Sequence, residues 1–159
     1  MATASELIAY LVAQGCLPMV AGTTPLAPPP NGAMLSPSER TRLGFRDTGY
    51  TFRYAAADGA VLADFGLQSA TVRADEADAD HALDALNKAI QGVAHDIHAQ
   101  EEPHPSDSGR TQRVFFVRVS ERRYARVTAA FPRLGLPSRA GIEVKVAGME
   151  AIGRRAASG

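Results

Sequence analysis

The sequence predicts an α+β fold in which one mixed β-sheet carries helices on one face. Residues 50–73 alternate apolar and polar side chains around a turn signal at Asp58-Gly59, which predicts an antiparallel meander. Residues 114–146 have the pattern of a strand, a helix and a second strand, which predicts a β-α-β crossover. A chain of 159 residues is long enough for one domain with a sizeable core.

The first third of the chain predicts a helix followed by an extended arm. Residues 5–14 have helical spacing of apolar side chains, and Gly15 is expected to end this helix. A Pro-, Gly- and Thr-rich tract follows at 21–34, and its three consecutive prolines favour an extended backbone. The sequence therefore predicts an N-terminal helix and Pro-rich arm over 1–35, and a single α+β domain over 36–155.

The domain is expected to begin with a short helical turn and the meander. Ser36-Pro37 has the pattern of a helix cap with proline at the first helical position, and this turn is expected to end near Gly44. The meander follows with strands over 50–55 and 61–65 and a third run over 67–73.

The longest predicted helix begins in the acidic segment 75–80. Steps of three and four residues place five apolar side chains on one face of this helix. These side chains belong to Leu83, Leu86, Ile90, Val93 and Ile97. Residues 100–109 then predict a loop.

The crossover completes the predicted fold. Val114–Val119 favours a strand, Ser120–Phe131 a helix with Tyr124, Val127 and Phe131 on its buried side, and Gly141–Val146 a final strand. A connection of this kind joins parallel strands.

Charge is divided unequally along the chain. Residues 1–109 carry six basic and fourteen acidic side chains, a net of −8, and residues 110–159 carry eleven basic and three acidic ones, a net of +8. Two interpretations follow: the halves neutralise each other within the chain or across an oligomer, or the Arg-rich half contacts an anionic partner.

The remaining composition excludes several classes. The single cysteine, Cys16, rules out an internal disulfide framework, and we expect it to be a small buried side chain. No apolar run approaches the length of a membrane span, and the N-terminus does not resemble a signal peptide. We therefore expect a cytoplasmic protein that does not enter the membrane.

No catalytic motif is present, so catalytic residues stay unknown. His95 and His98 are three residues apart but lack further ligands, so we expect no metal site and no cofactor. The Arg-rich half lacks interleaved aromatic side chains, so we expect no nucleic-acid partner. Arg139 follows Pro137-Ser138 and is placed either to bind a carboxylate or to form a salt bridge with an acid of the long helix.

Several segments resemble the C-terminal half of the Rid (YjgF-like) proteins. These are the strand at 114–119, the segment through Phe131, and Leu136-Pro137-Ser138-Arg139 before Ile142-Glu143-Val144. The resemblance implies a chorismate-mutase-like fold that forms trimers with clefts between subunits, although the same elements also suit ferredoxin-like sheets. It further implies that Arg139 binds the carboxylate of an imine or enamine acid, which is hydrolysed without a cofactor, and that Glu150 matches the family's glutamate.

Two functional hypotheses result. The first is a non-catalytic or weakly catalytic oligomer, similar to the Rid proteins, that binds a small carboxylate in an intersubunit cleft through Arg139 and Glu150. If it is an enzyme, it is a cofactor-free deaminase. The alternative is a structural subunit of a larger complex, including a phage-like particle, that uses opposed acidic and basic surfaces.

Overall fold

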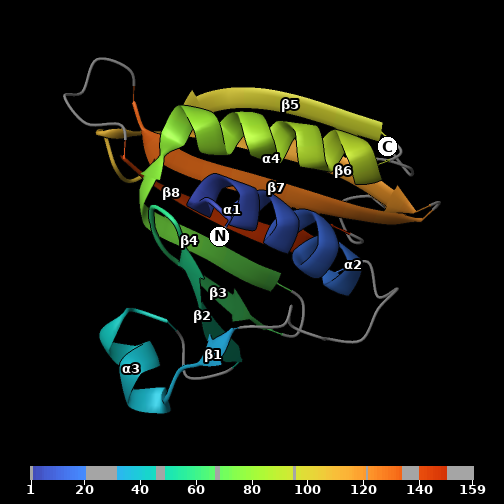
Figure 1. Ribbon diagram of the computed structural model, residues 1–159. Coiled ribbons are helices and arrows are strands. Elements are labelled where there is room, and N and C mark those ends of the chain that lie inside the picture. The colour runs from blue at the N-terminus through green and yellow to red at the C-terminus, as the bar shows by residue number, and fades with distance from the viewer. Residues whose placement is uncertain are drawn as a thin grey trace.

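The computed structural model describes residues 2–20, 32–45, 49–66, 69–94, 96–120, 122–133 and 140–149 (Figure 1). The described residues form one eight-stranded β-sheet with the strand order β1-β2-β3-β4-β8-β7-β6-β5. Every neighbouring pair of strands is antiparallel. None of the described helices is long and apolar enough to cross a membrane.

The strands are β1 (Ala33–Met34), β2 (Tyr50–Ala56), β3 (Gly59–Phe65), β4 (Ser69–Asp78), β5 (Asp96–Pro103), β6 (Arg110–Ser120), β7 (Arg123–Pro132) and β8 (Ala140–Gly148). The helices are α1 (Ala4–Tyr10), the π-helical η1 (Leu11–Cys16), α2 (Leu17–Val20), α3 (Pro37–Arg42) and α4 (Ala79–Val93).

The predicted fold class is wrong because the crossover helix does not exist. Residues 123–132 form strand β7, which pairs with β6 on one side and β8 on the other. Apolar side chains at every second position of β7, among them Ala125, Val127 and Ala129, are buried. A period of two is typical of a strand, and in β7 it lets each buried side chain pack against side chains of the neighbouring strands β6 and β8.

The strand order and the position of the helices also exclude the architectures expected from the family resemblance, because no described helix joins the consecutive strands β6, β7 and β8. The described residues show neither a chorismate-mutase-like nor a ferredoxin-like α+β fold. The description of the chain as Rid-like, or YjgF-like, is therefore not supported by the structure, since the strand–helix–strand unit on which it depended is three antiparallel strands.

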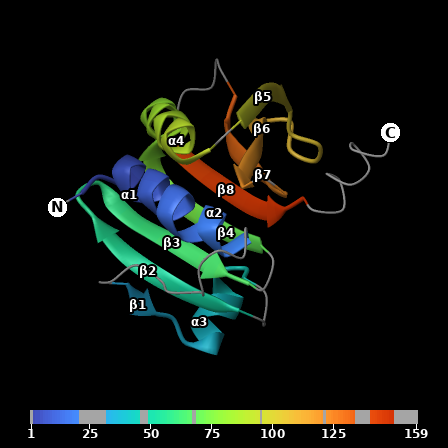
Figure 2. The same ribbon diagram turned by 90° about the vertical axis from the view of Figure 1, so that its right-hand side faces the viewer.

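The helices α1, η1, α2 and α4 pack against one face of the sheet, which curls around them (Figure 2). Ile8, Leu11 and Leu86 from the helices are fully buried together with Val72 and Val144 from the central strands. Each such side chain contributes about 1.5–3 kcal/mol when it leaves water. The helices and the sheet therefore hold each other in place.

The N-terminal helical segment is longer than predicted. It continues through Gly15 to Val20, with a π-helical turn in the middle. Leu11, Val12 and Leu17 are buried against the sheet, and their packing outweighs the loss of about 1 kcal/mol that glycine causes within a helix.

The acidic segment before α4 also differs from the prediction. Residues 75–78 extend β4, and Asp78 caps the helix by accepting a hydrogen bond from the His81 amide at 3.0 Å. The predicted apolar face is confirmed for Leu83, Leu86 and Ile90, but Val93 is 36% exposed. Ile97 lies in β5, so the segment predicted as a loop begins with a strand.

The meander hairpin and the short helix are confirmed. β2 and β3 pair from Tyr50↔Phe65 to Ala56↔Gly59, so the two turn residues are Ala57 and Asp58, one position earlier than predicted. Gly59 has a φ of +124° and begins the return strand. The helix α3 starts with a capping box between Ser36 and Glu39.

We call the sheet face opposite to α1 and α4 the open face. Of the described helices, only the short α3 is attached to it. Arg40 makes this attachment: its Nε donates to Thr51 Oγ1 at 2.7 Å, and one terminal nitrogen donates to Asp64 at 3.2 Å. Thr51 Oγ1 in turn donates to Asp64 at 2.7 Å. The guanidinium is buried but paired, so this cluster holds α3 in place.

Replacement of Leu86 by alanine tests the packing of α4 on the sheet. We expect Leu86→Ala to lower the free energy of unfolding by about 2–5 kcal/mol, because a cavity would form in the core. The exposed Gln91→Ala on the same helix is the control and is expected to change it by less than about 0.5 kcal/mol. Urea denaturation followed by circular dichroism measures both, and equal stabilities of the two variants would contradict the described packing.

Candidate functional site

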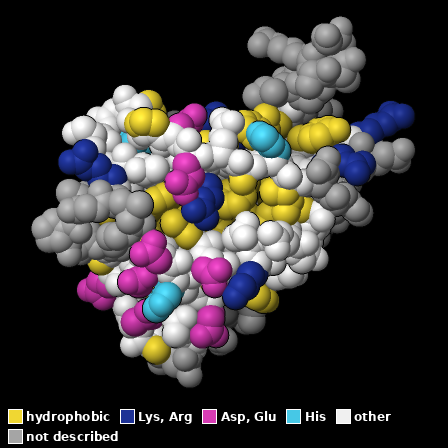
Figure 3. Space-filling view, turned by 90° about the horizontal axis from the view of Figure 1, so that it is seen from above, with side chains coloured by type: hydrophobic (Ala, Val, Ile, Leu, Met, Phe, Trp, Pro, Cys, Tyr) yellow, Lys and Arg dark blue, Asp and Glu magenta, His cyan; other side chains and the backbone are white. Residues whose placement is uncertain are grey.

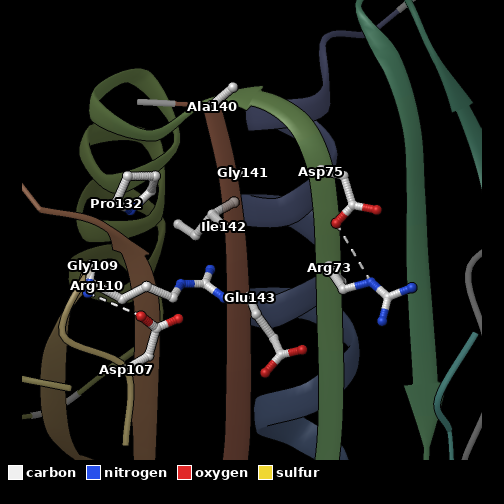
Figure 4. Close-up of a pocket in the computed structure, with 10 residues that line it drawn as sticks. All are labelled: Arg73, Asp75, Asp107, Gly109, Arg110, Pro132, Ala140, Gly141, Ile142 and Glu143. Atoms are coloured by element: carbon white, nitrogen blue, oxygen red, sulfur yellow. Dashed lines mark hydrogen bonds and ion pairs between the residues drawn. The ribbon is translucent and has the colours of Figure 1, made fainter. Parts of the chain in front are cut away.

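A pocket on the open face has a volume of about 400 Å³ and a mixed-charge lining (Figure 4). Its charged side chains are Arg73, Asp75, Asp107, Arg110 and Glu143. They come from β4, β6, β8 and the segment before β6, which the antiparallel pairing brings to one end of the sheet.

Arg73 is held in place by the protein itself. One terminal nitrogen donates to the Leu43 carbonyl at 3.0 Å, and the guanidinium lies over the Phe45 ring at 4.9 Å. Its Nε lies 3.6 Å from an Asp75 oxygen, in an ion pair. Arg73 therefore already has partners on several sides, and a ligand would have to replace one of them.

The other pocket charges are also partly paired. Arg110 donates to the Ala130 carbonyl at 3.0 Å, and its side chain points toward Glu143 in the close-up view (Figure 4). Glu143 lies 3.7 Å from Lys145, and Asp107 accepts from the Gly109 amide at 2.9 Å. Two guanidinium groups face three carboxylates, so the pocket does not favour a free carboxylate by charge.

The two predicted ligand residues, Arg139 and Glu150, lie outside the described residues, so the structure does not test them. Ala140 and Gly141, which follow Arg139 in the sequence, line the pocket. Gly141 has a φ of +103°, a conformation that glycine adopts without strain.

The two ends of the molecule carry opposite charges. Six acidic side chains gather where α1 and α4 begin, and we call this group the acidic end. Its members are Glu6, Asp58, Glu76, Asp78, Asp80 and Asp84. Asp58 accepts a hydrogen bond from the Ala4 amide at 2.7 Å, which joins the β2–β3 turn to the start of α1.

Only two of the six side chains of the acidic end are explained by helix capping. Asp58 and Asp78 bind the amides at the starts of α1 and α4, where the helix dipoles favour negative charge. Glu76 and Asp80 are exposed, and Asp84 forms an exposed pair with Lys88 at 3.1 Å. The view in Figure 3 shows acidic side chains gathered over the left part of this surface.

The basic end is the β6–β7 hairpin. Arg118 lies in β6, Arg122 in the turn, and Arg123 and Arg126 in β7. The ion pairs found within the described residues involve neither Arg118 nor Arg122 nor Arg126. Glu121, which precedes Arg122 in the sequence, lies outside the described residues.

Strand β8 sets the distance between the two ends. Its first residue, Ala140, pairs with Asp78, and its last, Gly148, pairs with Ala125 in the basic hairpin. Eight strand steps separate these positions, which corresponds to roughly 26 Å. This distance is well beyond the screening length of about 8 Å at physiological salt, so the two ends do not neutralise each other.

Arginine and aromatic side chains alternate on the open face of this hairpin. Phe116 lies opposite Arg126 and Arg118 lies opposite Tyr124 in the β6–β7 register. Tyr124 is 39% exposed, and the His98 ring from β5 stacks beside Phe116 with centroids 6.3 Å apart. This arrangement could not be predicted from the sequence pattern, which favours a helix for the segment with Tyr124 and Arg126.

The described residues include neither a reactive cysteine nor a cluster of metal ligands. Burial raises the pKa of the Cys16 thiol to about 12, so the thiol stays protonated at neutral pH. The expectation that Cys16 is a small buried side chain is confirmed. No cluster of possible metal ligands occurs within the residues that the structure describes.

The described residues thus form an antiparallel sheet with α1, η1, α2 and α4 on one face, the short helix α3 on the other, and charged ends. No protein-family model and no curated protein matches this chain. Among solved structures, it is similar to the Ran-binding protein Mog1p of Saccharomyces cerevisiae, with 12% identity, coverage of 82% of this chain and 74% of that chain, and a TM-score of 0.37. At this TM-score the likeness carries no conclusion about fold or function.

The buried thiol gives a direct test of the N-terminal packing. We expect Cys16 in the folded protein to be unreactive toward a disulfide reagent at pH 8, because it is inaccessible and protonated. In urea it should react at the rate of a free thiol. Absorbance of the released thiolate follows the reaction, and rapid labelling of the folded protein would show that the η1 segment does not pack as described.

Proposed function

We propose that this chain is a non-catalytic assembly protein that contacts other protein surfaces, including copies of itself, through its acidic and basic ends. The observation that carries this proposal is the separation of the two charge clusters by the length of β8. A protein with opposite charges at opposite ends presents complementary surfaces to the next molecule.

The ion pairs support the use of these charges between molecules. Only one ion pair found within the described residues joins the acidic half of the chain to the basic half, between Arg113 and Glu101. The other pairs lie within one half, as in Arg40–Asp64. Within the described residues, Arg118, Arg122 and Arg126 of the basic end form no ion pair with the acidic half.

A contact between unlike ends is heterologous. Repeated head to tail, it forms a ring when the rotation between copies closes and an open array when it does not. A larger complex would use the same two surfaces toward different subunits. A cytoplasmic location is part of this proposal, and the reduced Cys16 is compatible with it.

Sedimentation velocity at low salt and at about 0.5 M NaCl tests the proposal, since the screening length falls to about 4 Å at the higher salt. We expect the average mass at low salt to be at least about twice that at high salt, because the contact depends on exposed charges. A monomer at both salt concentrations would contradict self-assembly through the charged ends.

Charge reversal identifies the surfaces. Arg122→Glu with Arg126→Glu, and Asp80→Lys with Asp84→Lys, are each expected to abolish the low-salt species. Mixing the two variants should restore a complex, because each then offers one native and one reversed end. Arg42→Glu with Arg133→Glu changes the same charge at other exposed positions and is expected to leave the mass unchanged.

A further inference from the structure

Strand β5 forms one edge of the sheet. It pairs with β6 through eight consecutive residues, from Asp96↔Arg118 to Pro103↔Thr111, with no register shift. Within the described residues no strand pairs with its other side, which therefore presents alternate backbone N–H and C=O groups outward.

Apart from its acidic side chains, β5 lacks the features that usually protect an edge strand from pairing. The opposite edge, β1, is only two residues long, which leaves little backbone to pair. β5 is four times as long, carries no lysine or arginine, and contains proline only at its last position, Pro103. It has no bulge that would twist it away from another strand.

Apolar side chains continue past this edge toward α4. Ile97 and Ala99 lie on the helix face of β5, where Ile97 is half-buried and Ala99 exposed. Val93, at the end of α4, is 36% exposed, and Ala94 next to it is half-buried. Figure 3 looks onto this side and shows a strip of hydrophobic side chains across its middle. A strand added beside β5 would cover this strip.

The charge of the edge selects the partner. The charged side chains of β5 are Asp96, Glu101 and Glu102, and all are acidic. Glu101 bonds Arg113 and Glu102 accepts from Gln112 at 2.6 Å, so both carboxylates are held next to the edge. Glu101 lies on the same face as Ile97 and Ala99, whereas Glu102 lies on the opposite face. Basic side chains that alternate with apolar ones on an added strand would therefore meet the carboxylate of Glu102.

From these features we propose that β5 is a docking edge for an extended segment of another protein, in which apolar and basic residues alternate. The segment pairs with β5 as an additional strand, places its apolar side chains over Ile97 and Ala99, and directs its basic side chains toward Glu102 on the opposite face. Backbone hydrogen bonds provide the pairing, and the alternation provides the specificity.

A second copy of this chain fits the edge less well. Antiparallel pairing of two β5 strands would place six carboxylates in one ribbon without a lysine or arginine from either strand. The docking edge uses the backbone of β5 and not the arginines of the basic end, although the first residue of β5 lies opposite Arg118, so it does not depend on the assembly proposed above.

The probe is a fluorescein-labelled peptide of eight residues that alternates valine and arginine. We expect it to raise the fluorescence anisotropy at moderate salt and to slow amide exchange of β5 residues. A peptide that alternates valine and glutamate should bind at least about tenfold more weakly, because it brings like charges together. Equal binding of both peptides would overturn the predicted charge of the partner.

Methylation of backbone nitrogens shows whether the peptide binds as a strand. One peptide carries N-methyl groups on all valines and the other on all arginines. Since alternate residues of a strand direct their N–H groups to the same side, only one of the two peptides should lose binding. Retained binding of both, or unchanged exchange of the β5 amides, would overturn strand addition.

A matched pair of protein variants locates the site. Ala99→Lys places a positive charge on the exposed edge and is expected to weaken binding of the valine–arginine peptide at least about tenfold. Ala55→Lys makes the same change at an exposed alanine of β2 and should leave binding within about twofold of wild type. Concentration-dependent protection of β5 in the protein alone would instead assign the edge to a second copy and overturn the proposal.

Discussion

The pairing of β8 between β4 and β7 is the interaction on which the rest of the structure depends. β8 joins the N-terminal meander, β1 to β4, to the C-terminal strands β5 to β7, so that two antiparallel units become one sheet. Val144 and Val146 then lie between Val72 and Ala70 on one side and Ala129 and Val127 on the other. This continuous apolar surface is what α1, η1 and α4 cover. Without β8 neither unit would present a surface wide enough for both helical segments.

The same strand determines the distribution of charge. Helix α4 begins next to the start of β8, and the β6–β7 hairpin turns next to its end, so sequence segments with opposite net charge are directed to opposite ends of the molecule. Acidic residues are favoured where α1 and α4 begin, since free amides point outward there. No comparable local requirement applies to the arginines of the hairpin, whose strands are held by backbone pairing. Local structure therefore explains the positions of acidic side chains at the acidic end, but not those of the arginines at the basic end.

The sequence predicted the elements whose local signals agree with their tertiary environment. The β2–β3 hairpin, α3 and the buried face of α4 were of this kind, because alternation, a capping box and a 3.6-residue period each determine a structure locally. Segment 123–132 was predicted wrongly because Tyr124, Val127 and Phe131 fit a helix while Ala125, Val127, Ala129 and Phe131 fit a strand. Small alanines carry little weight in a sequence pattern, and only the neighbouring strands β6 and β8 show that they are buried. The pocket and the arginine–aromatic pairs were missed for the same reason, since both depend on strand order.

The curl of the sheet around the helices determines how much of the outer strand β5 stays exposed. The helices cover the centre of the helix face, and the outer strand β5 carries apolar side chains at the limit of this cover (Figure 2). A sheet that ended at β6 would bury Phe115 and Val117 less well, whereas β5 shields them and in turn exposes its own edge. Extending a sheet always transfers the unpaired edge to the last strand, and the chain provides no further described strand to cover it. The acidic side chains of β5 oppose pairing between identical copies while leaving the backbone free for a basic strand, so the same residues that keep the edge from pairing with itself define what it accepts.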